Sequence, residues 1–559
     1  MDGRSKIADI KSKGISSNGI SSKGISSLSL VFGVICLALT CCIIFPLFCV
    51  FLTPKISDFI QVSSSAVWEQ AALNTFFECV CSTAASVLIG YVYAYAVING
   101  GIPFKRFFSF IPLLHLVTPP FVGGLAFILL LGRQGFITNT LLGLDVSLYG
   151  FWGLLIAQTL CFFPMAYMIC AQTLQNINPV LEQAAKSLGA GHFKIFLKVI
   201  LPLSAPGILS AVLFIAVSVM SDFGNPMIVA GRYKVLAVEI YTLLTGWVNG
   251  GTSAVLGIML VIPSLILFAL QNKLTNKAMQ KTATVGGSGH AATNDRPNLA
   301  VRILLTLFCI FISLCVFAQF AAIIAGSFQK LWGINRSFTL DHIKSIALCK
   351  LELCNSMCFA FEAAVISTLV AAAAAFIVYR TEYPLKKYID SVIQLPAAVP
   401  GTLFGLAFSI AAAKLNFHNS RALIVIAIAV GFIPFSYRTL SSAYMQIKST
   451  LDDGARSLGA SRMRLLFSVI MPVSKTALFN SFIYDFVRGV GTMSAVIFLV
   501  SFNTPLTSVK ILNLAEQGFW GDAAALALLL TLITFGVIGA GSAIINWSNR
   551  KINWRKRKI

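Results

Sequence analysis

Apolar stretches of about 20 residues, the length that crosses a bilayer as a helix, recur along the whole of this 559-residue chain. Inside the hydrocarbon layer a helix bonds all of its own backbone polar groups. Only 11% of the residues are charged, against about 25% in soluble domains, so a water-surrounded core cannot hide the apolar side chains. We therefore expect an all-α membrane protein of about twelve transmembrane helices. The expected spans are residues 28–53, 70–98, 107–131, 148–174, 203–224, 253–272, 301–326, 356–380, 388–413, 421–444, 475–501 and 521–546.

The net charge of +22 would suggest a nucleic-acid partner in a soluble protein. Here the location of the charge is more informative. When the loops are assigned alternately to two sides, most of the 42 Lys and Arg residues fall on the side that holds both termini. An excess of Lys and Arg marks the cytoplasmic side. We expect cytoplasmic termini, basic loops that face anionic lipid, and no nucleic-acid partner. The first span is too long for a signal peptide and is expected to stay in the membrane.

Polar stretches divide the chain into two halves. Residues 1–27 contain GISS three times and predict a disordered cytoplasmic tail. Residues 273–300, rich in Gly, Thr, Asn and Lys, are predicted to link a first half, 28–272, to a second half, 301–549. A basic tail, 550–559, follows. Because six spans is an even number, both halves enter the bilayer in the same orientation, and parallel halves place a translocation path at their interface.

One short sequence occurs in both halves, between the fourth and fifth spans of each. It reads EQAAKSLGAGHFKIFLKVILP from Glu182 and DDGARSLGASRMRLLFSVIMP from Asp452, 270 positions later. Each copy starts with acids that suit a helix N-terminus, passes through a glycine that favours the end of a helix, and reaches a proline at the start of the next span. The glycines are Gly189 and Gly459, and the prolines are Pro202 and Pro472. We predict two helix–turn–helix elbows on the cytoplasmic surface; the alternative is a pair of interfacial helices that rest on lipid.

The repeated sequence resembles the signature of the permease subunits of bacterial ABC importers, in which EAA, three residues, Gly, nine residues, Ile, one residue and Leu-Pro follow one another. The resemblance implies a type I permease fold with both six-helix halves fused, a place in the bacterial inner membrane, and elbows that couple to ATPase subunits. Gln183 replaces the signature glutamate in the first copy, and Asp453-Gly454 replaces Glu-Ala in the second, so we expect the two contacts to differ in strength. The expected coupling residues are Glu182, Gln183, Ala184, Ala185, Gly189, Pro202, Asp452, Asp453, Ala455, Gly459 and Pro472.

The chain lacks the sequence GxxxxGK[ST] of a phosphate-binding loop, so we expect a transporter subunit and not an enzyme. The resemblance implies that ATP and Mg bind to two partner ATPase subunits, a homodimer, on the cytoplasmic side. It also implies a soluble substrate-binding protein on the outer side, received by loops within 225–252, 327–355 and 502–520. No cofactor or metal is expected in this chain, because no CxxC pair occurs among the 13 cysteines. Whether Cys349 and Cys354 form a disulfide stays open.

The third and ninth spans contain Pro and Gly at mid-membrane, as VTPPFVGGLAF (117–127) and LPAAVPGTLFGLAF (395–408). Such breaks are tolerated where helices line a cavity, although packing kinks are the alternative. Charges inside spans are costly and are functional candidates; an internal ion pair is the alternative for Asp485 and Arg488, which lie three residues apart. The candidate pathway residues are Pro119, Pro120, Gly123, Gly124, Pro400, Gly401, Gly405, Glu78, Glu362, Asp485 and Arg488.

Two further sequences bear on the cargo. SDFGNPMIVAG (221–231) and GTMSAVIFLVS (491–501) look like sequences of fused permeases for ferric iron, and the second also resembles 2-aminoethylphosphonate relatives. The resemblance implies ferric iron as cargo, with 2-aminoethylphosphonate, polyamine, thiamine or sulfate as alternatives. An ion-driven secondary transporter is the alternative from another class, and it predicts a relay of intramembrane carboxylates. A membrane enzyme has little support, because no His–carboxylate cluster accompanies the charges inside the spans.

Overall fold

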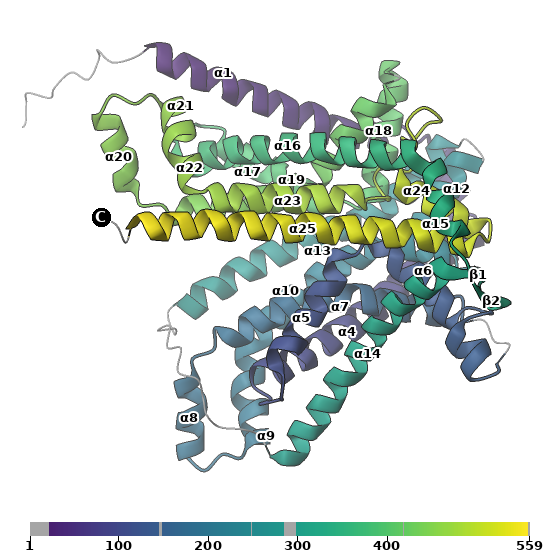
Figure 1. Ribbon diagram of the computed structural model, residues 1–559. Coiled ribbons are helices and arrows are strands. Elements are labelled where there is room, and N and C mark those ends of the chain that lie inside the picture. Colours follow the sequence, from purple (N-terminus) through teal and green to yellow (C-terminus); the bar gives the residue numbers. More distant parts are fainter. Residues whose placement is uncertain (1–21, 145–147, 247–248, 284–297, 418, 557–559) are drawn as a thin grey trace, which may run out of the picture.

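The computed structural model describes the chain except for residues 1–21, 145–147, 247–248, 284–297, 418 and 557–559. The described part is almost entirely helical (Figure 1). Ten of its helices are long and apolar enough to cross a membrane, or twelve spans when each of two sharply bent helix pairs is counted as one. The expected all-α architecture of about twelve spans is therefore confirmed. All 13 cysteines are free thiols, so Cys349 and Cys354 are not joined.

The first half begins with a span that is interrupted by one π-helical turn and continues through five further spans. Its elements are α1 (Ser22–Leu39), η1 (Thr40–Ile44), α2 (Phe45–Leu52), α3 (Ile56–Ser63), α4 (Ala66–Ile98), α5 (Lys105–Val117), α6 (Pro120–Leu131), η2 (Phe136–Leu141), α7 (Phe151–Gln175), α8 (Pro179–Ser187), α9 (His192–Ile195), η3 (Phe196–Ile200), α10 (Leu201–Met220), α11 (Gly224–Val229), α12 (Leu236–Gly246) and α13 (Gly250–Ala283).

The second half repeats this order and adds a β-hairpin after its first span. Its elements are α14 (Leu299–Phe328), β1 (Gln329–Leu331), β2 (Asn335–Phe338), α15 (Asp341–Ser345), η4 (Ile346–Cys349), α16 (Lys350–Arg380), α17 (Lys386–Gln394), η5 (Leu395–Ala397), α18 (Gly401–Leu415), α19 (Ser420–Gln446), α20 (Ser449–Ser457), α21 (Arg462–Leu465), η6 (Leu466–Ile470), α22 (Met471–Val473), α23 (Lys475–Val490), α24 (Thr507–Glu516) and α25 (Trp520–Lys556). The strands β1 and β2 pair antiparallel.

Small residues hold the second and fourth spans of each half close together. A Cβ placed on Gly90 of α4 would lie 2.6 Å from the Cβ of Ala166 in α7, and the alanine-rich middle of α16 packs against α19 in the same way. Without a hydrophobic force between helices in lipid, such close backbone approach supplies the packing energy. These two helix pairs are the scaffolds to which the elbows and the broken spans are attached.

The predicted breaks in the third and ninth spans are confirmed. In the third span α5 ends before Thr118, and α6 begins after Pro119, whose ψ of 137° is not helical. In the ninth span the two helices meet at 109°, with Pro400 at a ψ of 137° between them. Proline lacks the N–H that would continue a helix, and it turns the residue before it away from helical geometry.

The eleventh span differs from the prediction of a helix over 475–501. Helix α23 ends at Val490, and no regular helix forms from there to α24. Gly489 and Gly491 flank this end, and the next residues fold back on α18. There the carbonyl oxygen of Ala495 lies 2.6 Å from where a Cβ on Gly405 would be. A close backbone contact with α18 thus replaces the last turns of the expected helix.

The first span of each half lies against the other half. In Figure 1, α1 lies over α16 and α17, and α14 lies along the helices of the first half. The side-chain contacts agree: Thr40 and Tyr388 share a hydrogen bond of 2.6 Å between their hydroxyls, and the rings of Phe107 and Phe317 stack at 6.2 Å. The two halves are therefore interlocked by an exchange of their first spans, which the order of the spans in the sequence did not reveal.

Candidate functional site

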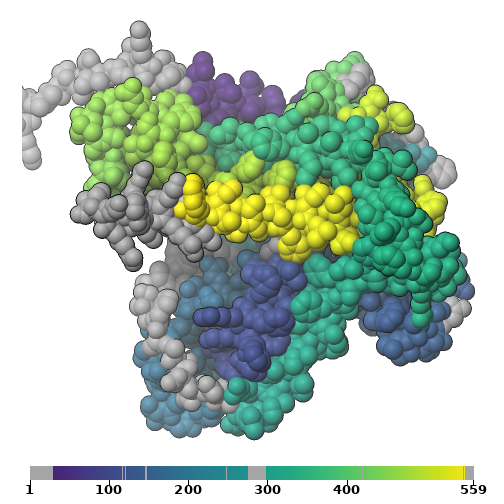
Figure 2. All heavy atoms as spheres, in the orientation of Figure 1, coloured from purple at the N-terminus to yellow at the C-terminus, as the bar shows by residue number. Residues whose placement is uncertain are grey.

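The two predicted elbows are present and lie at the same end of the molecule. In Figure 1, α8 and α9 lie at the lower left and α20 and α21 at the upper left, and in the space-filling view they form separate lobes (Figure 2). The described ends of the chain also lie at this end (Figure 1). The first elbow leads through the π-helical turn η3 directly into the membrane helix α10. The second leads through η6 and the short helix α22, and the chain then bends by 80° at Ser474 into α23.

One glycine sets the bend of each elbow. Gly189 has φ +79° and Gly459 has φ +77°, and a Cβ on either would meet no atom within 4 Å. The left-handed backbone, and not a lack of space, requires glycine there. The N–H of the next residue reaches back to close the helix end, from Ala190 to the carbonyl of Ala185 at 3.1 Å and equivalently at 3.0 Å in the second elbow.

The elbows expose apolar tips beside the predicted coupling residues. Leu188 is 88% exposed, Leu458 is 90% exposed and Phe193 is 75% exposed. Large apolar side chains in such exposed positions mark a surface that contacts either another protein or the membrane. The predicted coupling residues Gln183, Ala184, Asp453, Pro202 and Pro472 are exposed, and Ala185 and Ala455 are half-buried.

The remaining two predicted coupling residues turn inward. Oε1 of Glu182 accepts a hydrogen bond of 3.1 Å from Nδ2 of Asn99, the residue that caps the end of α4. Burial raises the pKa of Glu182, and Lys186 acts in the opposite direction. The equivalent Asp452 forms an ion pair of 3.0 Å with Arg380, the last residue of α16. Each acid therefore anchors its elbow to the second span of its own half.

The two anchors differ in chemistry. The pair of Arg380 and Asp452 is buried, with side chains 7% and 9% exposed. Arg380 also donates to the backbone carbonyls of Tyr444 and Ile447 at the end of α19. The anchor of the first elbow is a single hydrogen bond from a neutral amide to the Glu182 carboxylate, whereas an ion pair and two further hydrogen bonds from the Arg380 guanidinium hold the second.

A cavity of about 350 Å³ lies between the halves. The first half contributes α7, α10 and the start of α11, and the second contributes α18, α19, α23 and the irregular segment after α23. Of the predicted pathway residues, Gly401 and Arg488 line this cavity. Pro119 and Gly123 line a smaller pocket of about 20 Å³ that also includes Arg488, a volume that suits one water molecule.

Two of the predicted glycines lie close to a neighbouring segment. A Cβ on Gly124 would lie 3.1 Å from the side-chain Oδ1 of Asn225 and 3.6 Å from its Cα, and Gly405 faces the backbone of Ala495 as described above. In both halves, therefore, a glycine of the broken span contacts the segment that follows the fifth or eleventh span. Pro120 begins α6 and Pro400 caps α18.

The predicted intramembrane acids have partners of their own. Glu78 accepts a hydrogen bond from Ser82 within α4, and Glu362 forms an ion pair with Arg421. Asp485 accepts hydrogen bonds of 2.6 Å from both Ser367 and Ser436. Both hydroxyls donate to Oδ2, whereas the buried Oδ1 has no hydrogen-bond partner among the described residues, Arg488 included.

Two charged residues of the cavity were not predicted. Asp222 follows α10, and Arg438 lies in α19. Arg438 carries the same signal as Arg488, a cation inside an apolar span. Asp222 is part of the sequence SDFGNPMIVAG, which we used only for its resemblance to ferric-iron permeases, without singling out the carboxylate.

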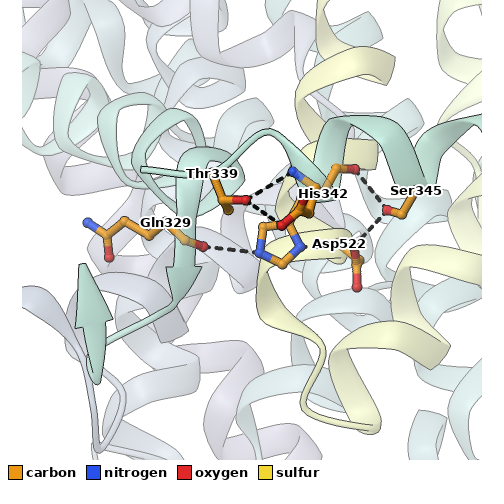
Figure 3. A network of polar contacts seen from close by, with 6 residues as sticks. Gln329, Thr339, His342, Ser345 and Asp522 are labelled. Atoms are coloured by element: carbon orange, nitrogen blue, oxygen red, sulfur yellow. Dashed lines mark hydrogen bonds and ion pairs between the residues drawn. The ribbon is translucent and has the colours of Figure 1, made fainter. Parts of the chain in front are cut away.

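A polar network braces the end opposite the elbows (Figure 3). Nδ1 of His342 lies 2.9 Å from Oδ1 of Asp522, and its Nε2 lies 3.0 Å from the carbonyl of Gln329. The same carboxylate oxygen accepts a hydrogen bond of 2.7 Å from Ser345. The network joins the hairpin and α15 to the start of α25, and so gives this end a fixed surface.

Comparison with known proteins gives the same duplication. The sequence profile described as "Binding-protein-dependent transport system inner membrane component" matches residues 86–280 and again 365–553. The chain is similar to the "Ferric transport system permease protein FbpB" of Actinobacillus pleuropneumoniae, with 31% identity over 450 residues, 78% of this chain and 64% of that protein. It is 30% identical over 413 residues to the "Putative ferric transport system permease protein FbpB 1" of Haemophilus influenzae, 71% of this chain and 65% of that protein.

A shorter relative matches about a third of this chain. The "Molybdenum transport system permease protein ModB" of Escherichia coli K12 is 27% identical over 191 residues, 33% of this chain and 82% of that protein. The aligned region spans slightly less than two thirds of the length of the two ferric relatives.

Proposed function

Because the chain belongs to the family of binding-protein-dependent transport system inner membrane components, we propose that it is the fused permease of an ATP-driven importer whose cargo is ferric iron. The observation that carries the proposal is the pair of elbows. Two equivalent elbows, 270 positions apart in sequence, lie at one end of the molecule, and each leads into a membrane helix of its own half, α10 or α23.

The elbows are the coupling elements for two ATPase subunits, which form a homodimer that binds ATP and Mg. Closure of the ATPase subunits moves both elbows, and the anchors at Glu182 and Asp452 transmit that movement to α4 and α16. The two halves then rock around the cavity between them. This chain carries no phosphate-binding loop in its sequence, so it converts movement and does not hydrolyse ATP.

The elbow end faces the cytoplasm of the bacterial cell, together with both termini and anionic lipid headgroups. The opposite end receives a soluble binding protein. The hairpin, α12 and α24 lie at that end (Figure 1), and the network around His342 holds the hairpin in place.

The cargo and the coupling are tested together by uptake of radioactive ferric iron. Cells that lack the gene are supplied with the full chain, its ATPase and its binding protein. We expect uptake that disappears when either the chain is omitted or the ATPase is made unable to hydrolyse ATP. If deletion of the chain leaves iron uptake intact and abolishes that of 2-aminoethylphosphonate, polyamine, thiamine or sulfate, that compound replaces iron as the cargo.

A further inference from the structure

The cavity between the halves carries more positive than negative side chains. Arg438 and Arg488 line it, and Asp222 is the one carboxylate among its lining residues. Asp222 is turned into the protein: its Oδ2 accepts hydrogen bonds of 2.9 Å from Asn225 and 3.1 Å from Gln158. Two guanidinium groups therefore dominate the electrostatic potential of the space.

Neither arginine forms an ion pair within the described residues. Arg438 donates from Nε to Oε1 of Gln394 at 3.3 Å, and its guanidinium lies 5.7 Å from the centre of the Phe268 ring. Asp390, the acid near Arg438, accepts a hydrogen bond of 2.6 Å from Tyr437. Neither guanidinium is thus paired directly with a carboxylate among the described residues, although Asp390 lies near Arg438 and Asp485 lies about one helical turn from Arg488.

The two cations lie on either side of an aromatic pair. The rings of Phe435 in α19 and Tyr484 in α23 stack at 3.5 Å. Helix α19 runs toward the elbows and α23 runs away from them (Figure 1). Arg438 is therefore about one helical turn from the stack on the elbow side, and Arg488 is about one turn from it on the opposite side. A solute that passes between the halves meets one guanidinium before the stack and one after it.

This arrangement suits an anion and not a bare metal ion. A small trivalent cation needs several oxygen ligands, and the described residues contain no group of three or more His, Cys, Asp or Glu that could hold a metal. Two guanidinium groups repel a cation, whereas their forked N–H groups match carboxylate and phosphate oxygens. We propose that the cavity binds a small oxyanion of the carboxylate or phosphate type, and that a ferric cargo passes as a complex with such an anion. This proposal rests on the proposed function and specifies the chemical form of the cargo.

The test follows two labels through variants of the full chain in cells that also contain the ATPase and the binding protein. Radioactive iron is supplied as its complex with carbon-labelled citrate. Arg438→Gln and Arg488→Gln are each expected to lower uptake of both labels at least about tenfold. This is the effect expected from the loss of one charge-assisted hydrogen bond to the anion. The lysine variants of the same residues keep the charge and are expected to lose less. Arg421→Gln removes an exposed cation from the same helix α19 and is expected to stay within about twofold of the original rate.

A binding measurement separates the function of the cavity from folding. The purified complete transporter, prepared without the binding protein, is titrated with labelled citrate and with labelled phosphate. We expect saturable binding that weakens in both glutamine variants and persists in the Arg421→Gln control. Joint uptake of iron and citrate identifies the metal complex as the source of the anion, and uptake of citrate alone identifies the free anion.

The outcomes for the two proposals are distinct. If the glutamine variants take up iron at the original rate or faster, or if iron enters without any anion and no anion binds, the anion site is wrong while the iron importer stands. If the unaltered transporter moves no iron but binds citrate or phosphate through both arginines, the anion site stands and the ferric cargo is wrong.

Discussion

At the scale of single residues, Gly189 and Gly459 have the most specific requirement. Each has positive φ in open surroundings, and a side chain in that left-handed conformation costs about 1–2 kcal/mol. We expect Gly189→Ala or Gly459→Ala to change the bend between the two elbow helices, and so to lower iron uptake several-fold without lowering ATP hydrolysis equally. The ratio of transport to hydrolysis in reconstituted vesicles is the measurement.

The first elbow contains its own control. Gly191 lies two residues beyond the bend and has φ −69°, and a Cβ on it would also meet no atom within 4 Å. Gly191→Ala should therefore leave the ratio unchanged. Equal effects of Gly189→Ala and Gly191→Ala would show that the left-handed bend has no part in coupling.

The anchors give a second prediction at this scale. Asp452→Asn leaves Arg380 without a buried counter-charge, and we expect a loss of about 1.5–3 kcal/mol in stability, the range for a hydrogen bond to a charged group. Glu182→Gln replaces a carboxylate that accepts its hydrogen bond from a neutral amide, so this variant should lose less stability than Asp452→Asn. Thermal unfolding of the two purified variants compares them directly. A larger loss in the first elbow would contradict the difference between the anchors.

At the scale of elements, the broken spans depend on close backbone contact. A Cβ on Gly405 would lie 2.6 Å from the carbonyl oxygen of Ala495, so Gly405→Ala must push the segment after α23 away from α18. Overpacking of this kind costs about 1–3 kcal/mol. We expect a lower unfolding temperature in detergent. Gly536→Ala, in α25 with no atom within 4 Å, is the matched control and should not lower the unfolding temperature, because alanine is the better helix former.

At the scale of the whole molecule, the cavity predicts a block that leaves the fold intact. Gly431 lines the cavity, and a Cβ there would meet no atom within 4 Å. We expect Gly431→Leu to place its side chain in the path and to reduce uptake strongly at a normal level of folded protein. Gly539→Leu, on the exposed side of α25, tests for a general effect of added bulk. Undiminished uptake by Gly431→Leu would place the path elsewhere.

The sequence predicted those features that local chemistry determines. The length of the apolar stretches predicted the spans. Proline predicted the breaks near Pro119 and Pro400, and the spacing of glycine and proline predicted the elbows. It did not predict contacts between distant elements. The inward turn of Glu182 depends on Asn99, which is 83 positions away, and the role of Gly405 depends on a segment that local hydropathy assigned to a helix. Arg438 could have been predicted as a candidate pathway residue on the same ground as Arg488, because placing a cation in an apolar span is energetically costly.

The exchange of first spans has a consequence for biosynthesis. Helix α2 packs against α18, which the ribosome completes more than three hundred residues later. During that interval the newly inserted α2 faces lipid or an insertion factor, and the first half also waits for α14 to cover α5 and α6. Neither half is a finished unit on its own, so the quality of assembly is decided only after the last spans have entered the membrane. Because both halves belong to one polypeptide, they stay together during that interval. The late spans can therefore pack against the early ones as soon as they are inserted, and two separate chains do not have to meet by diffusion.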